Sequence, residues 1–285
     1  MKIQGVVVFY NPTLQMINNI SLYINALDRL YVIDNSDNCE INITSALNNI
    51  SNLIEYKSMG GNKGIAAALN AGCRIALESG AHWVLTMDQD SSYEPDGFNI
   101  QVNALKEIQK DQANHIGILS SHHLIEFYQH QFIATPTFET DFVMTSGNLI
   151  NLSAYSAIDG FRDEFFIDEV DSDFCKRLKN NNYKILVANE AKLNHYLGNT
   201  RKHTFCFYSV MCSHHSYIRR YYITRNRLYM GRLYPELRRE YQLRNTVSLL
   251  KVIILEKDKL RKIRAFLDGF LDDFKRQYSE KKFTY

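Results

Sequence analysis

Two aspartates separated by one residue follow an apolar, β-prone segment at residues 83–87. If that segment is a strand, Asp88 and Asp90 lie on the same side of the chain, at the C-terminal edge of a sheet. Open α/β sheets bind their ligands at that edge. Two carboxylates this close repel each other unless a cation lies beside them. The pair therefore predicts a hard divalent ion that holds phosphate oxygens, and the alternative interpretation is an ordinary surface turn.

A second acidic cluster places four carboxylates within six residues, at Asp168, Glu169, Asp171 and Asp173. A carboxylate within hydrogen-bond reach can take the proton of an attacking hydroxyl, so the cluster is a candidate for a general base. If a helix begins near Val170, the same acids also favour its N-terminus electrostatically. We expect that structural role most for Asp173, but four acids exceed what capping requires.

The segments that must position these acids alternate between strand-like and helix-like patterns. The first apolar run shows no alternation and stops at Pro12, which is typical of a strand buried on both faces. Strand-like runs cover residues 3–11, 30–36, 53–57 and 83–87, and helix-like runs cover residues 14–27 and 65–77. This order predicts the α/β class, with a mostly parallel sheet and crossover helices.

Four motifs follow one another in the first third of the chain. They are Val-Val-Val-Phe-Tyr-Asn-Pro at 6–12, Val-Ile-Asp-Asn-Ser at 32–36, Asn-Lys-Gly-Ile-Ala-Ala-Ala-Leu-Asn-Ala-Gly at 62–72 and Asp-Gln-Asp-Ser at 88–91. In this order they resemble the inverting family 2 glycosyltransferases, whose fold is the Rossmann-like GT-A fold. Later matches are the small-residue loop 145–148, the acid segment 165–177, the His-x-x-Gly element 193–198, and residues 215–227, which resemble the tail of the bacterial rhamnosyltransferase branch.

The chain departs from the family at one position. Most members have Glu-Asp where this chain has Val170-Asp171, and residues 167–171 spell the Ile-Asp-x-Val-Asp pattern of the rhamnosyltransferase branch. The resemblance implies that Asp171 is the catalytic base, with Asp168 and Asp173 as alternatives. The departure leaves open which acid has which role.

The resemblance also implies a metal cofactor, Mg²⁺ or Mn²⁺, at the first acidic pair. Asp90 is the expected direct ligand, and Asp88 is expected to face the ribose of the donor or to reach the metal through water. His195 would complete the site by contacting the metal or a phosphate. The alternative for His195 is a polar residue satisfied at a strand end.

Donor recognition is expected at the other strand ends. Asp34 would accept a hydrogen bond from N3–H of thymine or uracil, and its alternative is a role in the turn alone. A glycine after a strand permits close approach of the backbone to a nucleotide. Arg225 would close over the diphosphate or the acceptor, and its alternative is a role in helix packing. The full set expected at the donor is Asn11, Pro12, Asp34, Asn62, Gly64, Asp88, Ser146, Gly147 and Arg225.

The charge is unevenly distributed. Residues 201–285 contain 20 Lys or Arg against 8 Asp or Glu, whereas the first 200 residues contain 13 against 23. We expect residues 1–230 to form the GT-A domain, with a nucleotide-sugar half at about 1–92 and an acceptor half at about 93–230, and residues 231–285 to form a basic helical extension. From Ser248 onward, apolar residues recur at helical spacing among cations, which predicts a helix that lies on an anionic membrane or packs on the domain.

Composition excludes several classes of protein. An odd number of cysteines, five, without a C-x-x-C pair argues against a disulfide framework. We expect no signal peptide and no membrane span, because the chain enters a strand at once and lacks a run of some 18 apolar residues. The basic residues follow no nucleic-acid motif, so no nucleic acid is expected. The predicted location is the bacterial cytoplasm, at the inner face of the membrane.

Taken together, the residues and the resemblance predict transfer of a sugar, favouring L-rhamnose from dTDP-L-rhamnose, to a lipid-linked saccharide of O-antigen, capsule or wall polymer. A donor such as a UDP-hexose or UDP-galactofuranose is the alternative within the same class. A sugar nucleotidylyltransferase would need a glycine-rich, arginine-bearing loop where Phe9-Tyr10-Asn11-Pro12 stands. A non-catalytic glycan- or nucleotide-binding module would not need Asp90 and Asp171. The sequence leaves a homodimer open.

Overall fold

A computed structural model describes residues 1–38, 41–108, 115–125, 135–195, 200–205, 208–276 and 278. The chain divides into two compact units. The sheet unit comprises Met1–Arg162 and Asp171–Tyr196, and the helical unit comprises Asp163–Val170 and Leu197–Tyr285. We expected a domain boundary at residue 230, which lies within the helix α8 (Tyr217–Leu233). The compact units instead meet after residues 162, 170 and 196.

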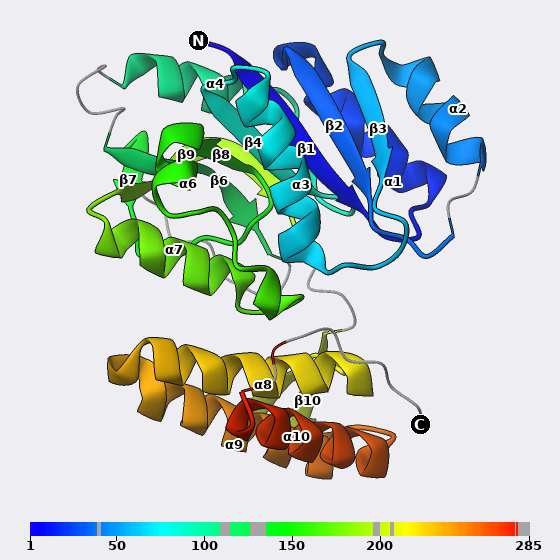
Figure 1. The fold of residues 1–285 in the computed structure, drawn as a ribbon, viewed down its shortest axis with the longest axis vertical. Coiled ribbons are helices and arrows are strands. Elements are labelled where there is room, and N and C mark those ends of the chain that lie inside the picture. The colour runs from blue at the N-terminus through cyan, green and yellow to red at the C-terminus, as the bar shows by residue number, and fades with distance from the viewer. Residues whose placement is uncertain are drawn as a thin grey trace. The chain divides into compact units, whose positions relative to one another are not determined.

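The first half of the large sheet is parallel, as the alternating pattern predicted. Its strands are β1 (Ile3–Phe9), β2 (Arg29–Asp34), β3 (Ile54–Ser58) and β4 (Trp83–Asp88). β1 pairs in parallel with β2 and with β4, and β3 pairs in parallel with β2 (Figure 1). Every residue of β1 is buried, because both of its faces are covered. Val6 lies against Gly72 of α3 (Ile65–Glu78), and Val7 belongs to the core cluster with Ile17 and Leu27.

The second half of the sheet is mixed. Its strands are β5 (Ser92–Tyr93), β6 (Ile116–Leu124), β7 (Thr137–Glu139), β8 (Asn148–Asn151) and β9 (Lys184–Asn194). β8 lies antiparallel between β4 and β6, β6 pairs in parallel with β9, and β5 and β7 are antiparallel to β9. The strand order is β3-β2-β1-β4-β8-β6-β9-β5, with β7 beside β9. The expected α/β class is confirmed.

The segment expected to form one helix at residues 14–27 is broken. It forms α1 (Leu14–Asn18) and two 3-10 turns, η1 (Asn19–Leu22) and η2 (Ile24–Ala26). Ser21 Oγ donates to the Asn18 carbonyl and so competes for a backbone group of this segment. Asn19 Nδ2 instead donates to the carbonyl of Gln89, just after β4. Among the described residues, the other helices of this unit are α2 (Ile41–Ile50), α4 (Gly97–Glu107), α6 (Leu152–Ala157) and α7 (Val170–Asn180), although Val170 itself lies in the helical unit.

The helical unit contains a hairpin and three long helices. They are β10 (Arg201–Phe205), β11 (Tyr208–Cys212), α8, α9 (Arg238–Leu255) and α10 (Lys259–Phe274), with the short turns η3 (Asp163–Phe165) and η4 (Pro235–Leu237). α10 lies close to α8, because Gly269 has no side chain where a Cβ would be 2.7 Å from the Tyr221 carbonyl oxygen. The helical C-terminal region expected from the sequence is thus present.

A buried charge network holds this unit together. The Glu256 carboxylate accepts hydrogen bonds from Arg220 and from Lys262 Nζ, the latter at 2.7 Å, and both oxygens are therefore paired with cations. Cys212 Sγ lies 3.3 Å from the same carboxylate. Removal of one partner would leave buried charge uncompensated, at a cost of roughly 3–5 kcal/mol. Within the described residues, no helix has both the length and the apolar character that a membrane span requires.

Candidate active site

The carboxyl ends of β1, β2 and β4 meet at one edge of the sheet. In the parallel register Phe9 is opposite Asp34, and Val8 is opposite Asp88. The two acids that end β2 and β4 therefore flank the end of β1, which follows from strands of similar length in parallel register. This edge collects several of the residues that the sequence singled out.

Side chains tie the loops at this edge to one another. The backbone N–H of Asn11 donates to Ser36 Oγ at 2.7 Å. Gln89 pairs with the backbone of Tyr10 through both ends of its amide, at 2.8 and 3.1 Å. Asn11 has a φ of 47°, a left-handed conformation that asparagine tolerates better than most residues. Pro12 follows at once, so the path of the chain is fixed where β1 ends.

Asp34 is fully buried, with a relative exposure of 0%. Its Oδ1 accepts from the Ser36 N–H at 2.9 Å, and its Oδ2 accepts from the Tyr56 hydroxyl at 2.6 Å. These bonds give the carboxylate a role in the turn after β2. Because the side chain is fully buried, a direct bond to a nucleotide base would require the groups that cover the carboxylate to move.

Asn62 and Gly64 form the turn that leads into α3. Asn62 Oδ1 accepts from Asn35 Nδ2 and from the Gly64 N–H, both at 3.0 Å, and Asn35 Oδ1 accepts from the Lys63 N–H at 2.7 Å. Gly64 is the N-cap of α3 and has a φ of 88°, which a side chain would make costly. Two asparagines therefore hold a turn in which only glycine fits well.

The two aspartates of the first motif lie at the end of β4 and just beyond it. β4 ends at Asp88, and Asp90 lies in a turn that the Asp88 carbonyl closes by accepting from the Ser91 N–H at 3.4 Å. The strand alternation that was expected to place both carboxylates on one side therefore stops at Asp88. Both side chains are half-buried.

The loop at residues 145–147 is attached to the end of β4. The Asp88 N–H donates to Ser146 Oγ at 3.0 Å, and the Gly147 N–H donates to the Thr86 carbonyl at 2.8 Å. Gly147 has a φ of 75°, and a Cβ there would collide with Ser121 Oγ. We expected a loop of small residues here, and the positive φ and the nearby Ser121 hydroxyl explain why residue 147 is glycine.

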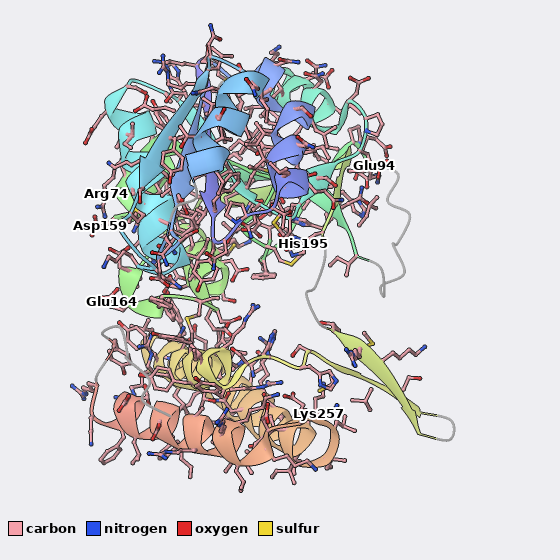
Figure 2. All side chains as sticks on the ribbon, turned by 90° about the vertical axis from the view of Figure 1, so that its right-hand side faces the viewer. Arg74, Glu94, Asp159, Glu164, His195 and Lys257 are labelled. Atoms are coloured by element: carbon pink, nitrogen blue, oxygen red, sulfur yellow. The ribbon has the colours of Figure 1, made fainter. Side chains whose placement is uncertain are left out.

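His195 directly follows β9, and its side chain is one of those labelled in Figure 2. Its Nδ1 lies 3.0 Å from the hydroxyl of Ser91, a buried residue next to Asp90. The ring packs edge-on to that of His123, with centroids 5.6 Å apart. The Ser91 contact ties His195 to the turn that carries Asp90, and any metal or phosphate would have to use Nε2.

His123 was not among the residues singled out from the sequence. Its Nε2 donates to the Ser146 carbonyl at 2.7 Å, so this histidine links the 145–147 loop to His195. Burial lowers the pKa of His123 to about 4, which keeps the ring neutral near pH 7. The available signal was a pair of histidines, His122 and His123, separated by two serines from the largely apolar run Ile116–Leu119.

The side-chain oxygens at this edge of the sheet could hold a divalent ion only together with oxygens of a bound substrate. Carboxylates such as those of Asp88 and Asp90 are the oxygen ligands that Mg²⁺ and Mn²⁺ prefer. Across the described part of the chain, no group of three or more His, Cys, Asp or Glu side chains is arranged to hold a metal. Mg²⁺ is commonly held by one or two carboxylates together with substrate phosphates, and these residues fit that arrangement.

The acids of the second cluster occupy different environments. In the sheet unit, Asp171 lies in the first turn of α7, is half-buried, and accepts from the Ser172 N–H at 2.9 Å. Asp173 is fully buried and accepts from Arg177 Nε at 2.7 Å, with Arg162 3.6 Å away. Asp173 also lies in the first turn of α7, where we expected it to favour the helix N-terminus, and it is engaged in a buried ion pair that the sequence did not indicate.

In the helical unit, Asp168 and Arg225 are both held by protein groups. Arg219 forms a bidentate pair with the Asp168 carboxylate, at 3.0 Å from each oxygen. Arg225 is fully buried, and its guanidinium donates to the backbone carbonyls of Glu164 and Phe165. Direct contact of Arg225 with a donor or acceptor would require these segments to move.

The family model for glycosyl transferase family 2 matches residues 10–165, more than half of the chain. The chain belongs to this family. The match includes the ends of β2 and β4 and the 145–147 loop, so most of the sheet edge described above lies inside it. The family 2 glycosyltransferase continues beyond the match with the acid segment and the helical unit.

One curated relative and two solved structures extend the comparison. This glycosyltransferase is 27% identical over 238 residues to the dTDP-rhamnosyl transferase RfbF of Shigella flexneri, which covers 79% of this chain and 78% of the relative. S. aureus TarS 1–349 in complex with UDP-GlcNAc superimposes with a TM-score of 0.52 and 13% identity, over 96% of this chain and 72% of TarS. GalNAc-T7 with UDP, GalNAc and Mn²⁺ gives a TM-score of 0.57 and 9% identity over 69% of this chain, which spans only 44% of that protein. At such identities the structures show a shared fold, that of the GT-A glycosyltransferases.

Proposed function

We propose that this glycosyltransferase moves L-rhamnose from dTDP-L-rhamnose to a lipid-linked saccharide in the synthesis of a bacterial surface polysaccharide, with inversion at the anomeric carbon. The observation that carries the proposal is the 27% identity to a dTDP-rhamnosyl transferase over 79% of the chain. The Ile-Asp-x-Val-Asp pattern at residues 167–171 supports the same branch of the family.

The donor is proposed to bind at the edge formed by β1, β2 and β4. Asn11, Pro12, Asn62 and Gly64 would line the nucleoside part, since they form the fixed turns after β1 and before α3. Asp34 would orient the base pocket through the Tyr56 hydroxyl, or bind the base directly once the groups that cover its carboxylate move. Both roles depend on the same carboxylate.

The diphosphate is proposed to lie beside the turn after β4. Asp90 would hold Mg²⁺ or Mn²⁺ directly, Asp88 would bind the ribose or reach the ion through water, and His195 Nε2 would contact the ion or a phosphate. Such an ion supplies Lewis-acid stabilisation of the departing diphosphate. Ser146 and Gly147 would set the width of this region, because their loop is bonded to the end of β4.

The acceptor hydroxyl must lose its proton as its oxygen attacks the anomeric carbon and the bond to the diphosphate breaks. Asp171 is proposed to accept that proton, since it is half-buried in the first turn of α7 and stands at the base position of the family pattern. Asp168 is the alternative base, and it would have to leave Arg219 to act.

The helical unit is proposed to lie on an anionic membrane, where a lipid-linked acceptor resides. Within α10, apolar side chains at helical spacing are exposed, among them Leu260 at 85% and Phe274 at 76%. Cations accompany them, including Lys257 in the turn before α10 (Figure 2). Basic amphipathic helices of this kind lie in the interfacial region of anionic bilayers.

A screen of nucleotide sugars for metal-dependent thermal stabilisation tests the donor. A ligand that binds only the native state raises its stability by about 2.7 kcal/mol at 100 times its dissociation constant. We expect dTDP-L-rhamnose with Mn²⁺ or Mg²⁺ to raise Tm more than either component alone. Stabilisation by a UDP-hexose or UDP-galactofuranose instead would contradict the proposed donor and leave the class of reaction intact.

A further inference from the structure

The segment that carries Asp168 has an unusual backbone. Phe166, Asp168 and Glu169 have φ values of 59°, 64° and 62°, although none of them is glycine. Each non-glycine residue in this left-handed region is disfavoured, and three within four residues persist only when surrounding groups impose the conformation. Something in the helical unit must therefore hold these residues.

Asn226 of α8 is the group that reaches this backbone. It is fully buried, and its Nδ2 donates to the carbonyls of Phe165 and Ile167, both at 2.7 Å, and of Asp168 at 3.0 Å. The two N–H groups of one side-chain amide thus serve three carbonyls of a segment that forms no regular ladder, so one N–H is shared between two of them. An unpaired buried carbonyl is costly, so loss of this amide would favour another backbone path.

Arg225 fixes the orientation of the Asn226 amide. Its Nε and a terminal nitrogen donate to Asn226 Oδ1 at 3.0 and 2.9 Å, which directs the Nδ2 end toward the segment. The guanidinium itself lies over the rings of Tyr221 and Tyr222, 5.6 and 4.9 Å from their centroids. Because guanidinium groups donate and never accept, the amide cannot flip without losing both bonds.

Side chains of the segment are held by the same helix. The Phe166 ring stacks on Tyr222 with centroids 4.6 Å apart, Asp168 pairs with Arg219, and Glu169 lies 3.2 Å from Arg227. All of these contacts lie within the helical unit. α8 therefore specifies both the backbone and the side-chain directions of the residues that lead into Val170, where α7 begins.

We propose that Asn226 is a positioning residue for the reaction, which sets the direction of Asp168 and of the chain that continues into Asp171. The inference rests on the proposed function, because it requires the base to come from this acid segment. It assigns Asn226 no contact with substrate. It also gives Arg225 a supporting role through Asn226.

The test is Asn226→Asp, which preserves shape and keeps an acceptor for Arg225 but turns oxygen lone pairs toward the three carbonyls. Asn245→Asp is the matched control, because Asn245 is also buried in this unit and its Nδ2 donates to a backbone carbonyl, that of Thr224, outside the acid segment. Nucleotide binding by dTDP with Mn²⁺, measured by calorimetry, gives the affinity and the number of competent sites. Transfer from the donor that the thermal screen identifies is then expressed per site.

Asn226→Asp should lower turnover per site by at least tenfold and leave the dTDP dissociation constant within twofold, whereas Asn245→Asp should leave both within twofold. Hydrogen exchange of residues 163–170, followed by mass spectrometry in the full chain, should accelerate in Asn226→Asp alone. Unchanged turnover per site, or unchanged exchange of this segment, would overturn the proposal. A fall in total activity that is explained entirely by fewer dTDP-binding sites would also overturn the proposal, since Asn226 would then be needed only for folding.

If the Asn226→Asp protein binds no nucleotide, the test uses Asn226→Ser, because serine keeps one hydrogen-bond donor in a smaller side chain. The same changes in turnover per site, dTDP affinity and hydrogen exchange are then expected. Failure of the proposed function is recognised separately. Wild-type protein would then form no glycoside with any nucleotide sugar, and the exchange measurement alone would decide whether Asn226 holds the segment.

Discussion

At the scale of single residues, the central chemical assignment is Asp90 as metal ligand. Asp90→Ala should abolish transfer and weaken donor binding in the presence of Mn²⁺, because a diphosphate without a bound cation lacks its main charge stabilisation. The measurement is donor affinity with and without Mn²⁺, together with turnover. Near-normal turnover with unchanged metal dependence would show that the metal is held elsewhere.

The catalytic base gives a second prediction for a single residue. Asp171→Asn keeps the volume and should leave nucleotide binding intact while turnover falls by roughly 100-fold or more, the scale of a lost general base. Asp173→Asn serves as the comparison, since its buried pair with Arg177 predicts a loss of stability measured by Tm. If Asp168→Asn causes the loss of turnover and Asp171→Asn does not, the two roles are exchanged.

The residues that belong to the site were easier to predict from the sequence than the groups that surround their side chains. It singled out Asp34 from its position after an apolar run, and the register confirms that this residue ends β2 opposite Phe9. The Tyr56 hydroxyl on its carboxylate comes from the neighbouring strand, a contact that no local pattern encodes. A packing role was foreseen as the alternative for Arg225, but its partners, carbonyls some sixty residues earlier in the chain, were equally hidden.

At the scale of elements, α10 carries the membrane prediction. Serine in place of Leu267, Phe270 and Phe274, each at least half exposed, should lower sedimentation with anionic vesicles by at least tenfold, since burying such side chains contributes about 1.5–3 kcal/mol each when complete. Serine at Leu14, Leu22 and Phe142, exposed apolar residues of the sheet unit, is the matched control.

Binding of wild-type protein should also weaken as salt rises, because cations near an anionic surface gain about 1 kcal/mol each at low ionic strength. If wild-type protein ignores anionic vesicles at low salt, the exposed face serves another purpose. A concentration-dependent dimer that the three serines disrupt would then identify a second copy of the chain as its occupant.

Truncation is a poor test of this element. A chain that ends before Ser248 would cut α9 and remove Glu256 and Lys262, leaving the buried Arg220 without its carboxylate. Loss of one partner from a buried ion pair costs roughly 3–5 kcal/mol. Surface substitutions on α10 avoid this effect.

The residues that precede α8 predict a dependence of stability on pH. Burial, reinforced by the nearby Arg219, lowers the pKa of His215 to about 4 from its ordinary value of 6.5. Between these values the unfolded chain binds a proton that the native protein does not, so stability is full above about pH 6.5 and declines as the pH falls toward 4. His215→Asn should reduce this decline by about 2 kcal/mol in denaturant titrations at the two pH values. Identical pH dependence in the variant would show that other groups cause the decline.

The elements themselves were predictable where hydrophobic periodicity was strong. The strands at residues 3, 30, 54 and 83 and the helix from Ile65 emerge near their expected positions, because buried strands and an Ala-rich helix have distinct patterns. The break of the expected helix at residues 14–27 was not predictable, since Ser21 competes for a local carbonyl and Asn19 bonds to the distant Gln89 carbonyl. The left-handed residues 166, 168 and 169 were also hidden, because a distant amide imposes their conformation.

At the scale of the whole molecule, the family and the fold are those that the order of the motifs predicted. The boundaries between the two compact units could not be predicted from that order. Residues 163–170, which include the first part of the acid segment, belong to the helical unit, although the residues on both sides of them belong to the sheet unit. A boundary of this kind depends on which residues pack together in three dimensions. Cys39 and Cys206, and the end of the His-x-x-Gly element at residues 196–198, lie outside the described residues, whereas Cys73, Cys175 and Cys212 are free and buried.

The most direct test of the proposed reaction uses the full chain with dTDP-L-rhamnose, Mn²⁺ and a panel of synthetic prenyl-diphosphate-linked saccharides. We expect release of dTDP in proportion to an acceptor product that is heavier by one deoxyhexosyl residue and has the α-configuration. Asp90→Ala should form none of this product. If neither dTDP-L-rhamnose nor any UDP-sugar yields a glycoside with acceptors on which a control glycosyltransferase is active, the proposed transfer is contradicted.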